Sequence, residues 1–268
     1  MFVVWCYLVG ELCVKIWVTD IMKIIFLGTN GWYNTETGNT PCVLVDTNSY
    51  YFIFDAGDGI YKVDKYVAGD KPIYLFLSHF HLDHISGLHI LNKFKFKQGI
   101  RIYGQEGTRK TLNHLIDHPF TSPLNELPLP VMVEELSEGM HKIPFDVTCR
   151  RLLHVDPCFG YRVNSGGKVI TYCTDTGICD NSLELARDAD ILIHECSEKS
   201  DQRSPEWPHT TPQEAARLAR KANVKQLVLF HFSAAVYNSI QERKEAEKYA
   251  RAIFKNTVAA VDGMEISV

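Results

Sequence analysis

Four side chains that can bind a metal ion occur within six residues of this sequence, at His79, His81, Asp83 and His84. They follow the apolar segment 74–77, which has the length and composition of a buried strand. Neutral imidazole suits zinc and similar ions, and a carboxylate can bind the same ion or a neighbouring one. A histidine-rich surface loop is the alternative, but the strand directly before the run favours a metal site.

Further residues of the same types follow other segments that we expect to be strands: His154, Asp175, His194 and His231. A single histidine after a strand is more often a hydrogen-bonded core residue than a ligand. Several strands that all end in His or Asp would line one edge of a sheet with donors. The pattern therefore predicts a site for a pair of metal ions.

The expected elements alternate between strands and helices. We expect strands at 23–27, 42–47, 50–54, 73–77, 147–154, 159–163, 168–174, 189–193 and 226–230, and a closing strand pair at 258–261 and 264–268. We expect helices at 107–117, from Thr211 onward, and at 239–254, where Ile240, Tyr249 and Ile253 should contact the core. Strand-rich halves followed by helices predict an α+β fold, with two sheets packed face to face and helices outside.

The composition limits the possible classes of protein. The chain has 268 residues, 46% of them hydrophobic, and a formal net charge of −4, so it has no general attraction to nucleic acid or to anionic membranes. Its eight cysteines form no Cys-x-x-Cys pair, and several lie in apolar segments. These features favour reduced cysteines in a cytoplasmic protein.

Residues 1–21 differ from the rest of the chain. They are largely apolar, but Glu11 and Lys15 interrupt the run, which is too short and too charged for a membrane span. A domain start is recognisable at Met22, where a strand leads to Gly28. We expect residues 1–21 to be an extension and residues 22–268 to form one domain without stable membrane association.

The run from His79 to His84 resembles the signature of the metallo-β-lactamase superfamily, and His154, Asp175 and His231 match the superfamily's remaining metal positions in order. The resemblance covers nearly all of residues 22–268 and implies an αββα sandwich. Segment 24–31 and the segments that contain Glu195 and His209 are similar to the ribonuclease Z group and its phosphodiesterase relatives.

The resemblance implies a role for each matching residue. Two zinc ions, or manganese or iron, would be bound, one by His79, His81 and His154, the other by Asp83, His84 and His231, with Asp175 between them. Such a pair generates hydroxide at neutral pH. Asp83 would also orient the hydroxide, and His209, held by Glu195, would be the general acid. Asp55 and His194 are expected to support the ligands.

Two departures from the ribonuclease Z pattern bear on the substrate. His154 and Asp175 are only 21 positions apart, which leaves no room for the long arm that grips transfer RNA in many of these enzymes, and Leu82 replaces a common glycine. We therefore expect a hydrolase of small or cyclic phosphodiesters. A ribonuclease Z-like endonuclease for transfer RNA 3′ ends, a lactone or thioester hydrolase, and a metal-binding protein without hydrolysis are the alternatives.

One feature favours RNA. Lys93, Lys95 and Lys97 alternate with other residues and would share one face of an extended segment. Such a row can attract phosphate, although more often it keeps a sheet edge soluble. We also expect a homodimer, in which a second subunit could bring this row to the cleft.

Overall fold

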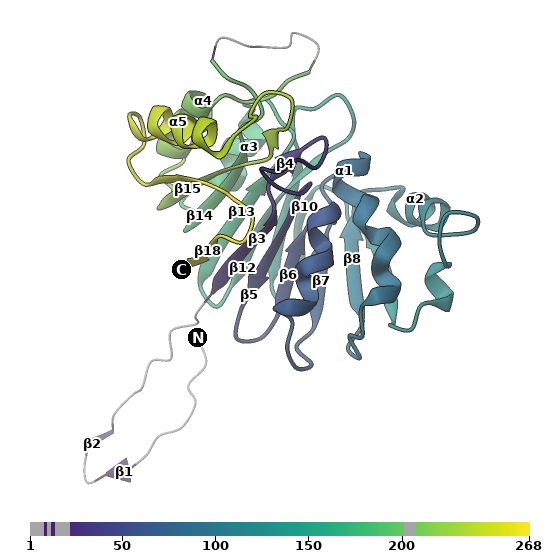
Figure 1. Ribbon diagram of the computed structural model, residues 1–268. Helices are drawn as coiled ribbons and strands as arrows, with labels where there is room; N and C mark the ends of the chain where they lie inside the picture. The colour runs from purple at the N-terminus through teal and green to yellow at the C-terminus, as the bar shows by residue number, and fades with distance from the viewer. Residues whose placement is uncertain (1–7, 10–11, 14–21, 201–206) are drawn as a thin grey trace.

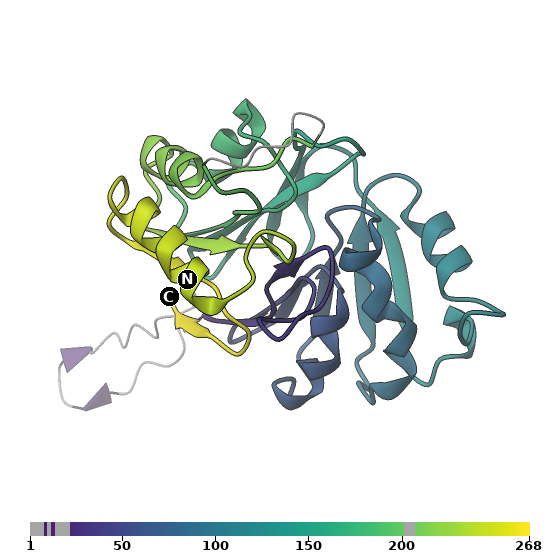
Figure 2. The same cartoon turned by 45° about the horizontal axis from the view of Figure 1, so that its top comes forward.

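The computed structural model describes residues 8–9, 12–13, 22–200 and 207–268. Two seven-stranded sheets lie face to face, with helices on the outer side of each (Figures 1 and 2). The expected α+β sandwich is confirmed. Apart from Leu8–Val9 (β1), which pairs with Leu12–Cys13 (β2), the predicted extension lies outside the described residues.

The first sheet has the strand order β18-β3-β5-β6-β7-β8-β9. Its strands are β3 (Lys23–Gly28), β5 (Cys42–Asp46), β6 (Tyr51–Phe54), β7 (Ile73–Phe76), β8 (Ile100–Gly104), β9 (Val131–Glu135) and β18 (Glu265–Ser267). Its outer face is covered by η1 (Asp58–Lys65), α1 (Leu82–Ile85), η2 (Ser86–Lys93), α2 (Thr108–Leu115) and the short η3 (Leu124–Glu126) (Figure 2). Strands β6 to β9 run parallel, so their carboxyl ends meet at one edge.

The second sheet has the order β10-β11-β12-β13-β14-β15-β17. Its strands are β10 (Gly139–Lys142), β11 (Asp146–Arg151), β12 (Phe159–Ser165), β13 (Lys168–Cys173), β14 (Ile191–Glu195), β15 (Gln226–Phe230) and β17 (Thr257–Ala259). Helices α3 (Asp180–Ala186), α4 (Pro212–Lys221) and α5 (Ile240–Arg251) cover its outer face. The small pair β4 (Asn30–Gly31) and β16 (Phe232–Ser233) joins the two halves of the chain.

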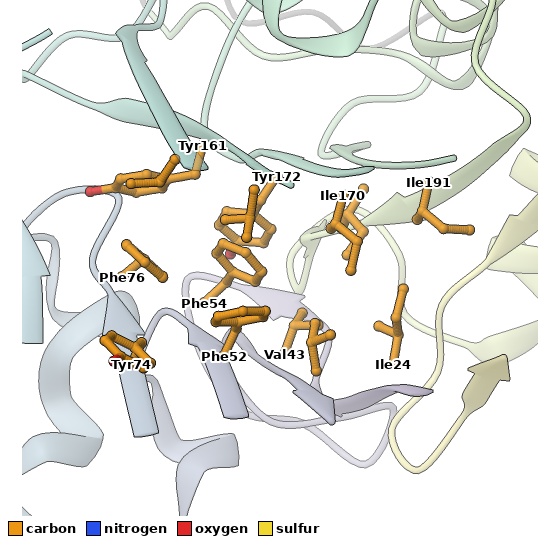
Figure 3. Close-up of a cluster of buried hydrophobic side chains, with 14 of the residues drawn as sticks. Ile24, Val43, Phe52, Phe54, Tyr74, Phe76, Tyr161, Ile170, Tyr172 and Ile191 are labelled. Carbon is orange, nitrogen blue, oxygen red and sulfur yellow. The ribbon is translucent and has the colours of Figure 1, made fainter. Parts of the chain in front are cut away.

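Aromatic side chains fill the space between the two sheets (Figure 3). Successive strand residues point to opposite faces, so Phe52 and Phe54 enter this core while Tyr51 and Ile53 pack under the helices. Phe54 stacks on Tyr172 of the other sheet with ring centroids 5.1 Å apart. Each fully buried side chain of this size contributes about 1.5–3 kcal/mol to stability, so the core holds the two sheets in a fixed relation.

The helix expectations are confirmed in position, with one error in detail. Thr211 caps α4, accepts a hydrogen bond from the Glu214 backbone N–H, and is followed by proline at the first turn. In α5, Tyr249 is 56% exposed, so its predicted core contact is wrong. The large side chain that α5 buries is Arg243, which donates to Thr29 Oγ1 and Asn30 Oδ1 and lies over the Phe232 ring.

The expected strand pair at the C-terminus is also wrong, because the two segments belong to different sheets. β17 extends the second sheet beside β15, whereas β18 pairs with β3 in the first. The chain crosses between them at Asp262 and Gly263, where Asp262 Oδ1 accepts from Thr29 Oγ1 and Oδ2 pairs with Lys62. This crossing joins β17 and β18, which are edge strands of the two sheets.

Six cysteines lie in the part of the chain for which side chains are described, and all six are free thiols. Within residues 22–200 and 207–268, no helix has the length and apolar character needed to cross a membrane.

Replacing a core aromatic should be costly. Phe52 is fully buried with its ring centroid 4.6 Å from that of Phe145, so Phe52→Ala should lower the free energy of unfolding by about 3–5 kcal/mol, measured by urea titration. Met140, which is 65% exposed, supplies the control, and Met140→Ala should change stability by less than about 0.5 kcal/mol. Equal effects of the two variants would contradict this description of the core.

Candidate metal centre

The seven donors predicted from the sequence converge where the two sheets meet. They form three groups in which one ligand atom per residue lies within 4.8 Å of the others: His79, His81 and His154; His79, His84 and Asp175; Asp83, His84 and His231. His79 and His84 each belong to two groups, so the three groups form one continuous cluster. Asp175 contributes the oxygen that lies between the two ends.

One end of the cluster brings four electron-pair donors very close together. The Nε2 atoms of His84 and His231 are 3.1 Å apart, and each lies 3.0 Å from Oδ2 of Asp175. Oδ2 of Asp83 lies 3.4 Å from the first nitrogen and 3.5 Å from the second. These are the donor types that bind a divalent cation.

Hydrogen bonds behind the rings assign their tautomers. Nδ1–H of His84 donates to Oδ2 of Asp55 at 2.7 Å, which leaves a lone pair on Nε2. The Ser197 hydroxyl donates to the His231 carbonyl, so it accepts from Nδ1–H of His231 at 3.1 Å. Both Nε2 atoms therefore face Asp175, where each can give its lone pair to a metal ion, and such outer partners are typical of metal-binding histidines.

His79 follows the same rule. The Ser78 hydroxyl donates to Asp55 at 2.8 Å and accepts from Nδ1–H of His79 at 3.0 Å. The buried Nε2 of His79 then has no hydrogen-bond partner among the described residues. An unsatisfied buried nitrogen costs about 1–3 kcal/mol, and a cation bound there would satisfy it.

Burial and the neighbouring carboxylates make the cluster favourable for a positive ion. Burial, followed by the neighbouring His84, lowers the pKa of His79 well below its usual value, which keeps its lone pair free. Burial alone would lower the pKa of His84, but the carboxylates of Asp83 and Asp175 raise it well above the usual value. A site that draws a proton onto a buried imidazole attracts a divalent cation for the same reason, so the residues fit the metal pair that the family implies.

The other end of the cluster is more open. His154 Nε2 lies 3.5 Å from His81 Nδ1, and burial lowers the pKa of His154. Nε2 of His81 lies 2.9 Å from Asp156 Oδ2. His81 can thus turn Nδ1 toward the cluster while Asp156 holds its other nitrogen.

Sharp backbone turns occur where several residues of the site follow their strands. Asp55, Asp175 and His231 have φ values of 57°, 47° and 50°, in the left-handed region that non-glycine residues rarely adopt. A Cβ on Gly31 would lie only 2.4 Å from the His231 ring, so only glycine allows strand β4 to pack against that ligand. Such strain commonly marks functional sites.

Glu195 and His209 form a buried pair beside the cluster. Oε1 of Glu195 accepts from Nδ1–H of His209 at 2.8 Å and from the Thr176 backbone N–H at 2.6 Å, and Oε2 accepts from the Ser197 N–H at 3.0 Å. Burial lowers the pKa of His209, but the Glu195 carboxylate outweighs it and raises the pKa to about 9. His209 therefore holds its proton more firmly than an ordinary histidine.

His194 is the one candidate that the structure keeps apart from the donors. In β14, Ile193 faces the core between the sheets and Leu192 faces the helices. Alternation puts Glu195 on the site side and His194 on the helix side, with its Nδ1 3.0 Å from the carbonyl of Glu195. Among the described residues, no contact joins His194 to a metal-ligand side chain, so its expected supporting role stays a prediction.

Several residues of the site were not found from the sequence. Ser78, Ser197 and Tyr172 each bond to a donor or to Asp55, and the Trp32 N–H donates to Asp83 Oδ2 at 2.8 Å. Ser78, directly before the histidine run, was the only one with a local signal. The others come from distant segments and depend on the packing of the two sheets.

A family model described as "Beta-lactamase superfamily domain" matches residues 52–232, about two-thirds of the chain. The protein therefore belongs to the metallo-β-lactamase superfamily. A structure with the same fold is the protein YhfI from Bacillus subtilis, with a TM-score of 0.76 and 24% identity over 93% of this chain and 100% of that one.

Within the superfamily the chain is ribonuclease Z-like. It is 26% identical to ribonuclease Z of Bacillus velezensis over 92% of this chain and 99% of that protein. It superposes on the short form of human tRNase Z with a TM-score of 0.73 and 27% identity, over 92% of this chain and 99% of that one. The protein is a metal-dependent hydrolase, and its His and Asp cluster indicates divalent metal binding.

Metal content tests the cluster. The purified protein should contain about two divalent ions per chain by elemental analysis. His79→Ala combined with His81→Ala should lower this to about one, because one end of the cluster loses two donors. His114→Ala, at an exposed histidine on α2, should leave the content unchanged. Equal loss in control and double variant, or no bound ion in the wild type, would be evidence against the site.

Proposed function

We propose that the protein is a phosphodiesterase that hydrolyses small or cyclic phosphodiesters. The observation that carries this proposal is the hydrogen bond of His209 to the buried Glu195, 2.8 Å long, beside the donor cluster. An alkoxide leaving group needs a proton, whereas the thiolate that leaves a thioester does not, so this pair disfavours a thioester substrate. Hydrolysis also accounts for the pair better than a metal-binding role without catalysis.

The donor set divides into two positions. His79, His81 and His154 would hold one cation, and the second would be held by a set with more carboxylate, namely Asp83, His84 and His231, with Asp175 shared. When bound, the two cations supply hydroxide at neutral pH and neutralise charge on the phosphate. Zinc suits the imidazole-rich set best, and manganese or iron are compatible with it.

The protein's own side chains would complete the reaction. Asp83 accepts the Trp32 N–H on one oxygen and so has a fixed orientation toward the nucleophile. Hydroxide attacks phosphorus, the P–O bond to the leaving group breaks, and Nε2–H of His209 gives its proton to the departing oxygen. The products are a phosphate monoester and an alcohol, and water returns the proton to His209.

The strands around the site support a small substrate. Between His154 and Asp175 the chain forms only β12, β13 and the turn at Gly166 and Gly167. No arm extends there. The alignment with ribonuclease Z spans 310 positions, more than the 268 residues of this chain, so parts of that relative have no counterpart here.

RNA is the second candidate, because the curated relatives are ribonucleases Z. Within one subunit, the lysine row does not lie where it could hold an RNA at the cluster. Lys93, Lys95 and Lys97 come before β8, at the edge of the sheet opposite to the one where β7 leads into His79, and Lys93 pairs with Asp64. Only the second subunit of a homodimer could bring this row to the cluster.

The buried free cysteines support a cytoplasmic location of the protein, whichever substrate it hydrolyses.

Loss of the proton donor should depend on the leaving group. His209→Ala should lower kcat for alkyl diesters by about 10²–10⁴, with a smaller loss for nitrophenyl diesters and normal metal content. Because Glu195 raises the pKa of His209, wild-type kcat for alkyl diesters should fall as pH rises and His209 loses its proton. Cations at the neighbouring donors repel the proton and move this fall to lower pH.

The control for this experiment is His114→Ala, which removes an exposed histidine outside the site. An equal loss of kcat for all leaving groups in His209→Ala would instead assign a structural role to His209.

The substrate class is decided by comparing kcat/KM for a small diester with that for a precursor transfer RNA, at low and moderate salt. We expect turnover of the small diester and weak or no cleavage of the RNA. A strong preference for RNA that fades steeply with salt would reveal an electrostatic grip and would favour the endonuclease.

A further inference from the structure

Exposed apolar side chains gather around the mouth of the cluster. Among the described residues, twelve large hydrophobic side chains are exposed. Five of them stand next to a donor in the chain or contact one: Trp32, Leu82, Leu153, Val155 and Trp207. Clustered exposed apolar groups of this kind commonly mark a binding site.

Trp32 lies at the Asp83 end of the cluster. Its backbone N–H donates to Asp83, and its φ of 77° is unfavourable for a bulky side chain. The side chain is nevertheless 69% exposed, so burial does not compensate for this backbone conformation. An exposed indole on a strained backbone whose N–H bonds to a donor points to a ligand that covers the ring.

Trp207 lies at the other end. Its ring centroid is 6.0 Å from those of both His81 and His154, and the side chain is 43% exposed. The ring is nearly parallel to that of His209, with an interplanar angle of 8° and centroids 6.5 Å apart. Trp207 is therefore next to the proton donor, on the side where a leaving group departs.

No lysine or arginine among the described residues forms an ion pair with a donor of the cluster or with Glu195. The exposed apolar side chains next to the donors therefore offer a surface for recognition beyond the phosphate. Indole rings bind flat rings by stacking, and a base on an aromatic side chain contributes about 1–3 kcal/mol.

We propose that Trp32 and Trp207 are stacking platforms for flat rings on the two ester groups of the substrate. This inference rests on the proposed phosphodiesterase function and names its substrate class, diesters that carry a nucleobase or an aryl ring. Trp207, beside His209, takes the ring of the leaving group, and Trp32 takes the ring of the group that stays on phosphorus.

Two diesters with the same leaving group test Trp32. Thymidine 5′-(4-nitrophenyl phosphate) and methyl 4-nitrophenyl phosphate differ only in the retained group. The wild type should prefer the thymidine diester in kcat/KM, and Trp32→Gly should lower that preference about tenfold. Glycine adopts a positive φ without strain and keeps the N–H that bonds to Asp83. Tyr249→Ala, at an exposed tyrosine on α5, should keep the wild-type preference.

Ring-dependent rescue tests Trp207. With bis(4-nitrophenyl) phosphate, Trp207→Ala should lower kcat/KM about tenfold, and Trp207→Phe should restore most of it. No discrimination by the wild type, an unchanged preference in Trp32→Gly, or equal losses in the two Trp207 variants would overturn the proposal.

A binding measurement separates this inference from the proposed function. Titration calorimetry of the zinc-loaded protein should show adenosine 5′-monophosphate binding about tenfold more tightly than ribose 5-phosphate, which lacks the base. The difference should shrink in Trp32→Gly and persist in Tyr249→Ala. If no diester is hydrolysed, the phosphodiesterase function fails while this titration still decides whether the tryptophans bind rings. Equal affinities for the two ligands would refute the stacking platforms.

Discussion

The buried carboxylate of Asp55 is the interaction on which the rest of the site depends. It accepts from the Ser78 backbone N–H at 2.7 Å and from its hydroxyl at 2.8 Å, from Nδ1–H of His84 at 2.7 Å, and from the Tyr172 hydroxyl at 2.8 Å. A fully buried charge is tolerable only with such a set of donors. Tyr172 belongs to the second sheet, so one carboxylate fixes the histidine loop, orients a ligand and ties the two layers together.

This arrangement explains why the donors can be held close together by the protein. Burial would raise the pKa of Asp175, but His231 and His84 keep it well below the usual value, so the carboxylate stays charged beside them. The strained turns at Asp175 and His231 are kept by the aromatic core behind them, where Phe54, Tyr172 and Phe230 pack. Stability of the sandwich thus maintains the close spacing and the strained turns of the donor set.

The sequence predicted the parts of this site that local pattern encodes. The histidine run after β7, and His154, Asp175 and His231 after their strands, are visible because strand ends deliver side chains to a common edge. Glu195 and His209 came from family resemblance. Contacts between distant segments, such as Tyr172 with Asp55, left no local signal. The amphipathic pattern of α5 likewise suggested Tyr249 for the core, whereas Arg243 is buried there by bonds to Thr29 and Asn30.

The same geometry relates the chemistry to the choice of substrate. A ribonuclease that holds a folded RNA needs positive charge spread over many phosphates, and such binding weakens steeply with salt. Here Asp83, Asp175 and the histidines form a cluster that favours cations, and the exposed Trp32 and Trp207 lie next to it. Under the proposed function, one strong anion-binding point and an aromatic rim would select a single diester with flat substituents. Selectivity would then depend on ring stacking, which is less sensitive to salt than contacts to many phosphates.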